Sequence, residues 1–161
     1  MRKFAPPIIA FILIAVIAVF IWPGKQTINA DLTFNLLDGR KLQMADLHGK
    51  PLLVNFWSAN CPVCLHDMPK LAKLQDDTRE QGLQIIGVSI PQDPPPVILA
   101  MVKKLHPKHP LALDVHGEIA RAFGGISVTP STFLIDQQGK IVLSMYGALD
   151  SQGIKAHLAK L

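Results

Sequence analysis

Hydrophobic and polar positions follow two different patterns along the chain. Mostly apolar runs lie at 52–57 and 83–90, as in strands that are buried on both faces. Between them, residues 65–81 carry apolar side chains at helical spacing, and Gly82 ends this predicted helix. The strand–helix–strand order indicates an α/β fold.

An N-terminal hairpin is predicted ahead of this core. Two short segments, 33–37 and 41–44, have the composition of strands. The dipeptide Asp38-Gly39 between them favours a two-residue turn of type I′, in which both central residues have positive φ.

A helix–strand segment follows the second buried strand. Asp93 is predicted to cap a helix that carries residues 97–105, and a strand is predicted at 111–114. The alternative for Pro94–Pro96 is a stiff surface loop. The remaining expected elements are a helix at 116–123, a hairpin of strands at 132–135 and 141–145, and a terminal helix at 154–161. The closing hairpin makes the predicted central sheet mixed, with helices flanking it.

The N-terminal segment differs in composition from the rest of the chain, with a basic start and a long apolar run. We divide the chain into a cytoplasmic N-terminus at 1–7, a transmembrane signal anchor at 8–22, a linker at 23–30 and a folded domain at 31–161. As a helix, the apolar run at 8–22 spans only about 22 Å. Counted from Phe4, the segment spans about 28 Å, which is enough for a thin membrane.

A cleaved signal peptide is the alternative for this segment. Cleavage requires small residues at −3 and −1, and the best site, after Ala30, places the bulky Ile28 at −3. An uncleaved anchor is therefore favoured. Arg2 and Lys3 hold the N-terminus in the cytoplasm, so the domain is expected outside the bacterial inner membrane, in the periplasm.

The basic composition comes from the same front segment. The chain has 16 Lys and Arg, 12 Asp and Glu and a formal net charge of +4. Without Arg2, Lys3 and Lys25, 13 basic side chains face the same 12 acidic ones. No basic cluster with interleaved aromatic residues occurs, so nucleic-acid binding is excluded.

The chain has two cysteines, Cys61 and Cys64, two residues apart. A disulfide across so short a loop stabilises a fold little, whereas two thiols at this spacing at the start of a helix form a reversible redox pair. Pro62 suits the first helical position, so Cys61 is placed at or next to the N-cap.

The helix start gives the two cysteines different roles. Unpaired N–H groups and the helix dipole favour the thiolate of Cys61, which we expect to be the nucleophile, while Cys64 resolves the mixed disulfide. Asp67 lies on the same helical face as Cys64 and could move protons; an exposed charge is the alternative.

Two kinds of metal site are alternatives for the cysteine pair. A zinc site requires four ligands, and the chain has no second cysteine pair. A copper carrier could use Cys61, Cys64 and His66, with Met68 as a further soft ligand. Met68 also fits the apolar stripe of the predicted helix, where a core role is more common.

Several sequence blocks together resemble the thioredoxin superfamily, in particular the membrane-anchored TlpA/ResA-like thiol–disulfide oxidoreductases, including the cytochrome c maturation type. The blocks are Leu53–Trp57, Cys61–Cys64, Asp67–Pro69, Gly82–Val88, Val128–Asp136 and Gly139-Lys140. The resemblance covers nearly all of residues 33–161 in order. It implies a thioredoxin-like fold, with the 97–114 segment as the helix–strand insertion of this branch.

The resemblance also implies the surroundings of the disulfide. It implies a cis peptide bond between Thr129 and Pro130, placed against the cysteines, with Thr129 as a substrate contact. We expect further substrate contacts at Trp57, Pro62 and Val63, which border the two sulfurs.

Three residues depart from related patterns. Asn55 stands where thioredoxin has a buried Asp, Asp67 where this branch usually has Glu, and Asn60 where an aromatic residue commonly precedes the first cysteine. The first fits the TlpA-like branch. The shorter arm of Asp67 makes proton transfer to the thiols less direct.

The expected function is that of a periplasmic thiol–disulfide oxidoreductase, with reduction of substrates favoured over oxidation. No cofactor besides the Cys61–Cys64 pair is expected. The expected partners are thiols or disulfides of exported proteins and a membrane protein that donates electrons. Besides the copper carrier, a thiol peroxidase of the peroxiredoxin class is an alternative. That chemistry requires a proline and a hydroxyl residue ahead of the cysteine. Ser58 supplies the hydroxyl, but Val54 stands where the proline is needed.

Overall fold

The structure, a computed structural model, describes residues 26–161. The predicted cytoplasmic N-terminus at 1–7 and the predicted anchor at 8–22 lie outside this range. Within the described range, no helix combines the length and apolar composition that crossing a membrane requires.

The element order agrees with the expected α/β alternation. The strands are β1 (Thr33–Asn35), β2 (Lys41–Gln43), β3 (Leu52–Trp57), β4 (Gln84–Ser89), β5 (Leu111–Leu113), β6 (Ser131–Ile135) and β7 (Ile141–Tyr146). The α-helices are α2 (Pro62–Asp77), α3 (Pro95–Leu105), α4 (Glu118–Ala122) and α5 (Ser151–Leu158), and short 3₁₀ helices lie at Met44–Leu47 and Arg79–Gln81.

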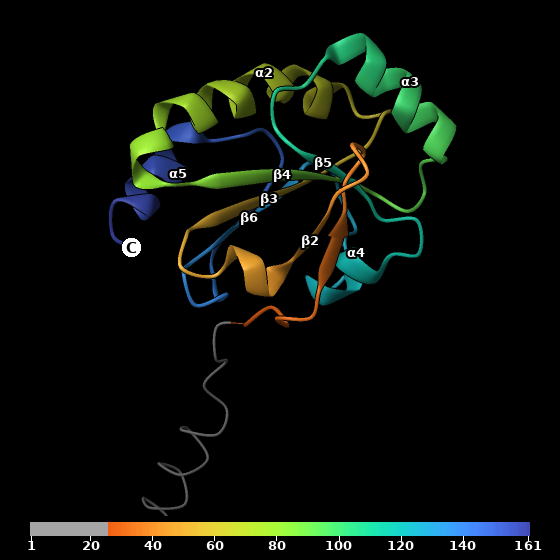
Figure 1. The fold of residues 1–161 in the computed structure, drawn as a ribbon. Coiled ribbons are helices and arrows are strands. Elements are labelled where there is room, and N and C mark those ends of the chain that lie inside the picture. Colours follow the sequence, from red (N-terminus) through yellow and green to blue (C-terminus); the bar gives the residue numbers. More distant parts are fainter. Residues whose placement is uncertain (1–25) are drawn as a thin grey trace, which may run out of the picture.

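Five strands form a mixed sheet in the order β5-β4-β3-β6-β7 (Figure 1). The pairs β3–β4 and β4–β5 are parallel, whereas β3–β6 and β6–β7 are antiparallel. β1 and β2 form a separate two-stranded sheet. The predicted fold class, a thioredoxin-like mixed sheet with an N-terminal hairpin and a helix–strand insertion (α3 and β5), is confirmed.

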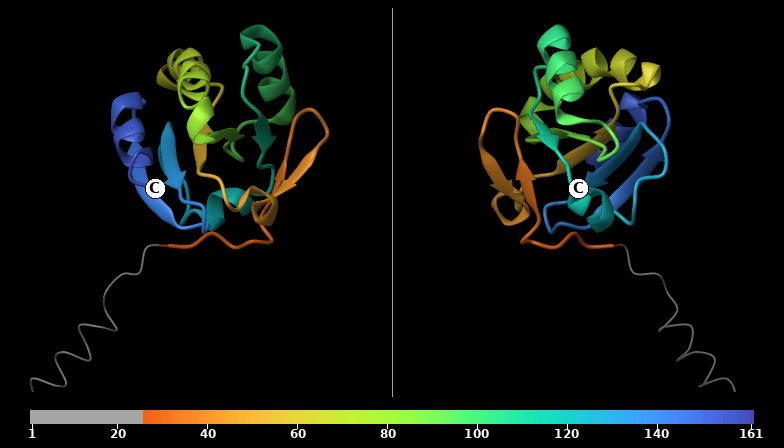
Figure 2. Two further views of the ribbon diagram at one scale, coloured as in Figure 1. Left: turned by 60° about the vertical axis from the view of Figure 1, so that its left-hand side comes forward. Right: turned by 90° about the vertical axis from the view of Figure 1, so that its right-hand side faces the viewer.

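Strand β3 occupies the middle of the sheet, and all six of its residues are buried. Its successive side chains point to opposite faces of the sheet. Leu53 packs with residues of α2 and α5 on one face, and Phe56 packs with Phe123 and Phe133 on the other. Helices α2, α3 and α5 cover the first face, and α4 and the hairpin lie on the second (Figures 1 and 2). A strand covered on both faces explains why five of the six residues of β3 are apolar.

Two sequence predictions about the N-terminal part need correction. Residues 26–30, predicted as part of a linker, belong to the fold: Thr27 pairs with Lys140, and Ile28 is buried and donates its N–H to the Gly139 carbonyl. The connection between β1 and β2 is not a two-residue turn. It spans residues 36–40, and Asp38 lacks the positive φ that type I′ requires.

Candidate active site

The cysteine pair lies where the sequence placed it, at the N-terminus of α2. Cys61 is the N-cap, with extended backbone angles, and Pro62 is the first helical residue. Pro62 lacks an N–H, and the first N–H of a helix needs no partner inside the helix, so proline costs nothing there. The two cysteines form a disulfide with their Cα atoms 5.2 Å apart, so the structure represents the oxidised state.

The two sulfurs differ in their surroundings. Cys64 is 2% exposed, whereas Cys61 is partly exposed. The backbone N–H of Cys64 donates to the Cys61 sulfur over 3.1 Å. When the disulfide is reduced, this N–H and the positive end of the α2 dipole favour negative charge on Cys61. The geometry therefore gives Cys61 both the exposure and the charge stabilisation of a nucleophile.

The predicted neighbours of the motif line one side of it. The Thr129–Pro130 peptide bond is cis, and the Thr129 carbonyl oxygen lies 3.6 Å from the Cys61 sulfur. Pro130 itself is buried, and its carbonyl accepts from the Gly147 N–H. Val63 and Val128 are exposed apolar side chains, at 43% and 52%, on the helix start and the cis-proline loop respectively. Exposed apolar side chains next to a reactive sulfur suit contact with an unfolded polypeptide.

Trp57 does not belong to this surface. It was predicted as a substrate contact, but its side chain is fully buried, at 0% exposure, and packs with Cys64 and Met68 beneath α2. The reason is strand alternation: Leu53, Asn55 and Trp57 point to the face of β3 that α2 and α3 cover. The prediction of substrate contact is therefore wrong for Trp57, while Pro62 and Val63 are exposed as expected.

Asp93 belongs to this site, although the sequence predicts it as a helix cap. Its carboxylate accepts from the Ala59 N–H over 2.7 Å and from the Ser58 hydroxyl over 3.1 Å. The Ser58 hydroxyl in turn accepts from the Asn60 N–H. Asp93 thus holds the loop between β3 and Cys61, and it caps no helix, since α3 has no side-chain cap. Three prolines follow Asp93 and remove the N–H groups that a cap would bind.

Asp67 is buried, at 1% exposure. This excludes the alternative to a proton-transfer role, in which Asp67 is merely an exposed surface charge. One carboxylate oxygen pairs with the Lys70 ammonium at 2.7 Å, and the other accepts from the Leu149 N–H, also at 2.7 Å. These bonds tie α2 to the segment before α5. They join the carboxylate to groups other than the two sulfurs, so the contacts of the oxidised state give no support to proton transfer by Asp67.

Asn55 lies beneath the site on β3. It is buried, and its side-chain amide donates to the Thr132 hydroxyl on β6 over 2.9 Å. The amide carries no charge, so the position holds two strands together without the ionisable group that thioredoxin has there.

His109, just before β5, is buried close to Trp57. Both its ring nitrogens and the Trp57 indole nitrogen lack hydrogen-bond partners within residues 26–161. Gly87 makes room for them: a Cβ at Gly87 would lie 3.3 Å from the His109 Nε2 atom and would collide with Leu111. Burial lowers the pKa of His109 from 6.5 to about 4.

This burial predicts a pH dependence of stability. The unfolded chain takes up a proton at His109 below pH 6.5 and the folded chain only near pH 4, so the free energy of unfolding falls across that window. The loss from this group should reach about 2 to 3 kcal/mol near pH 4.5. Urea unfolding of the wild type and of His109→Leu at both ends of the window measures it. The variant should lose that much less stability, and equal losses would contradict the assignment.

The copper alternative requires a cluster of soft ligands. His66 is exposed on α2, and Met68 is buried in the core beneath that helix. Within residues 26–161, no group of three or more His, Cys, Asp and Glu side chains is arranged to hold a metal ion. The donors of the predicted copper site are therefore not assembled in the oxidised structure.

Comparison with known proteins shows which family the chain belongs to. The sequence model described as the AhpC/TSA family matches residues 23–144. The chain belongs to this family. It is 31% identical over 138 residues to the thiol-disulfide oxidoreductase ResA of Bacillus thuringiensis, a match that covers 86% of this chain and 78% of the relative. A second relative of that name, from Halalkalibacterium halodurans, is 30% identical over 132 residues, 82% of this chain and 73% of the relative.

A solved structure agrees with the thioredoxin-like fold. A candidate thioredoxin from Neisseria meningitidis, solved in solution, aligns with a TM-score of 0.74 and 29% identity over 84% of this chain and 89% of that one. The chain is therefore a TlpA/ResA-like member of the thioredoxin superfamily and a thiol–disulfide oxidoreductase. The peroxidase alternative receives no support from the site, because the Ser58 hydroxyl is bonded to Asp93.

Proposed function

We propose that this oxidoreductase reduces disulfides of polypeptides outside the cytoplasmic membrane, with Cys61 as the attacking sulfur. The observation that carries the proposal is the asymmetry of the pair: Cys61 is partly exposed and accepts the Cys64 N–H, whereas Cys64 is buried behind it. A nucleophile must reach a large substrate, and a resolving thiol need only reach the nucleophile.

The reaction runs in two balanced steps. The Cys61 thiolate attacks one sulfur of a substrate disulfide, a mixed disulfide forms, and the other substrate sulfur leaves as a thiolate that takes up a proton. The Cys64 thiolate then attacks the Cys61 sulfur, closes the disulfide seen in the structure and releases the second substrate thiol. The enzyme thus gives two electrons to the substrate, and the two substrate thiols take up two protons, one released by Cys64 and one from solvent.

The roles of the neighbouring residues follow from their positions. Thr129 and the exposed side chains Pro62 and Val63 are proposed to contact the substrate backbone and side chains beside Cys61. Pro130 fixes the loop that presents Thr129. The predicted proton transfer by Asp67 stays a proposal for the reduced state, in which the buried carboxylate would take the proton that Cys64 releases.

The cellular setting rests on the front of the sequence. The basic start and the apolar run at 8–22 support an anchor in the inner membrane of a bacterium, with the domain on its outer side. Substrates would then be disulfides of exported proteins, including apocytochrome c as in the maturation branch. A membrane protein carrying a dithiol would return the enzyme to its reduced state, and no cofactor beyond the cysteine pair is needed.

The direction of electron flow is tested by the reduction potential of the Cys61–Cys64 couple. Equilibration of residues 26–161 with a glutathione or dithiothreitol series, followed by quantification of the two redox states, gives this value. A reductant should have a potential of about −300 mV. A value of about −120 mV, that of a strong oxidant, would contradict the proposed direction and leave the exchange chemistry intact.

A further inference from the structure

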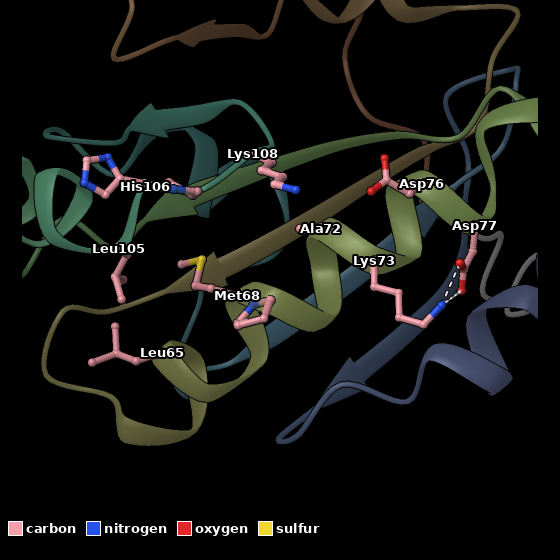
Figure 3. A pocket seen from close by; sticks show the side chains of 11 residues that line it. Leu65, Met68, Ala72, Lys73, Asp76, Asp77, Leu105, His106 and Lys108 are labelled. Atoms are coloured by element: carbon pink, nitrogen blue, oxygen red, sulfur yellow. Dashed lines mark hydrogen bonds and ion pairs between the residues drawn. The ribbon is translucent and has the colours of Figure 1, made fainter.

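A groove runs along α2 beside the disulfide. Its volume is about 470 Å³, and it lies between α2 and the segment that joins α3 to β5 (Figure 3). Leu65 and Leu105 point toward one another across it, and Met68 lies at its floor (Figure 3). Leu65 is one helical turn beyond Cys61, and both pack against the cluster that holds Cys64 and Met68, so the apolar end of the groove begins about one turn from the reactive sulfur.

A second hollow continues the groove toward the end of α2. It has a volume of about 460 Å³ and shares Ala72, Asp76 and Lys108 with the first. Lys50 and Arg79 line its far part. The lining therefore changes from apolar near the disulfide to cationic further along.

The two acidic side chains that line the groove, Asp76 and Asp77, both have basic partners. Asp76 pairs with Arg79 at 3.2 Å, and Asp77 pairs with Lys73 and Lys155 at 2.8 and 2.6 Å. Hydrogen bonds from these two lysines hold the pKa of Asp77 below its ordinary value.

Lys50 and Lys108 form no ion pair within residues 26–161, and both are exposed. The two acidic side chains of the groove are already neutralised by other partners. The groove thus offers two uncompensated positive charges to a ligand.

The dimensions fit an extended chain. A helix rises 1.5 Å per residue, so the path from Leu65 to the end of α2 at Asp77 is about 18 Å long. An extended polypeptide covers this length with about five or six residues. A small molecule would fill one hollow only, whereas a polypeptide can contact the apolar and cationic parts together.

We propose that this groove is a second substrate-binding site, which takes an extended segment of the polypeptide whose disulfide is exchanged. Apolar side chains of the substrate close to the reacting cysteine lie against Leu65 and Leu105. Acidic side chains several residues further along pair with Lys108 and Lys50. The inference rests on the proposed function, because it assigns the substrate class of that same reaction, and it predicts a preference for acidic flanks.

The experiment uses two peptides with the same cysteine, joined as a mixed disulfide to glutathione, and with an acidic or a basic flank. The reduced enzyme should reduce the acidic peptide with a higher kcat/KM, by about three- to tenfold. Lys50→Glu/Lys108→Glu should abolish or invert this preference. Lys160→Glu, which reverses an exposed charge at the C-terminus outside the groove, should keep it.

Two further readouts separate the groove from the redox chemistry. Glutathione disulfide is too small to span the groove, so its reduction by the wild type and by Lys160→Glu reports the redox chemistry alone. If the wild type reduces neither glutathione disulfide nor either peptide, the proposed function fails. Binding to the groove is measured separately, by fluorescence anisotropy with a version of the acidic peptide that lacks cysteine. This peptide should bind the wild type more tightly than Lys50→Glu/Lys108→Glu. Equal preference or equal binding in the wild type and the double variant would overturn the groove.

Discussion

Replacing Cys61 by serine is expected to lower the turnover of a disulfide substrate by about three orders of magnitude or more, because the attacking sulfur is lost. Cys64→Ser should also stop repeated turnover, since no second thiol remains to release the product. Steady-state reduction of glutathione disulfide or insulin by the two variants measures both losses.

The two variants should differ in what they retain. Cys64→Ser keeps the partly exposed sulfur and should consume about one equivalent of substrate before it stops, whereas Cys61→Ser leaves only a sulfur that is 2% exposed in the structure. Both variants should keep the fold, because a disulfide across four residues stabilises little. Turnover by Cys61→Ser at the wild-type rate would contradict the assignment of the nucleophile.

The second large effect is expected at Asp93. Asp93→Ala leaves the Ala59 N–H and the Ser58 hydroxyl without their acceptor, and both residues are 6% exposed. The expected loss is about 3 kcal/mol of unfolding free energy. Because this loop leads directly to Cys61, disulfide exchange should also slow by about tenfold. Urea unfolding and exchange kinetics measure the two effects separately.

Asp114 provides a matched control for Asp93. It is a buried carboxylate as well, and it accepts from the N–H groups of Ile119 and Ala120 at the start of α4. Asp114→Ala should therefore cost similar stability and leave exchange kinetics unchanged. If both variants slow exchange equally, the effect of Asp93 arises from general destabilisation rather than from the loop at Cys61.

The sequence predicted the features that depend on local patterns. The mostly apolar run of β3, the proline after Cys61 and the helical spacing beyond it fix the strand, the cap and the helix through neighbouring residues. The cysteine pair was therefore placed correctly at the N-terminus of α2. The order of elements also sufficed for the fold class, since strand–helix alternation followed by a hairpin leaves few topologies.

The sequence predictions failed where contacts between residues far apart in the chain determine the position of a side chain. Asp93 and Ala59 are 34 positions apart, so no local pattern shows their bond. The three prolines that remove the N–H groups next to Asp93 were the available signal against a cap. Trp57 is covered by α2 and α3, and its burial follows from strand alternation only once those helices are known to lie on that face.

The most direct test of the account is to map the mixed disulfide that each single-cysteine variant forms. Cys64→Ser and Cys61→Ser are each mixed with a peptide disulfide, quenched with acid and analysed by peptide mass spectrometry. The account predicts a stable adduct on Cys61 in the first variant and little or none on Cys64 in the second. An adduct that forms faster on Cys64, or on neither sulfur, would contradict it.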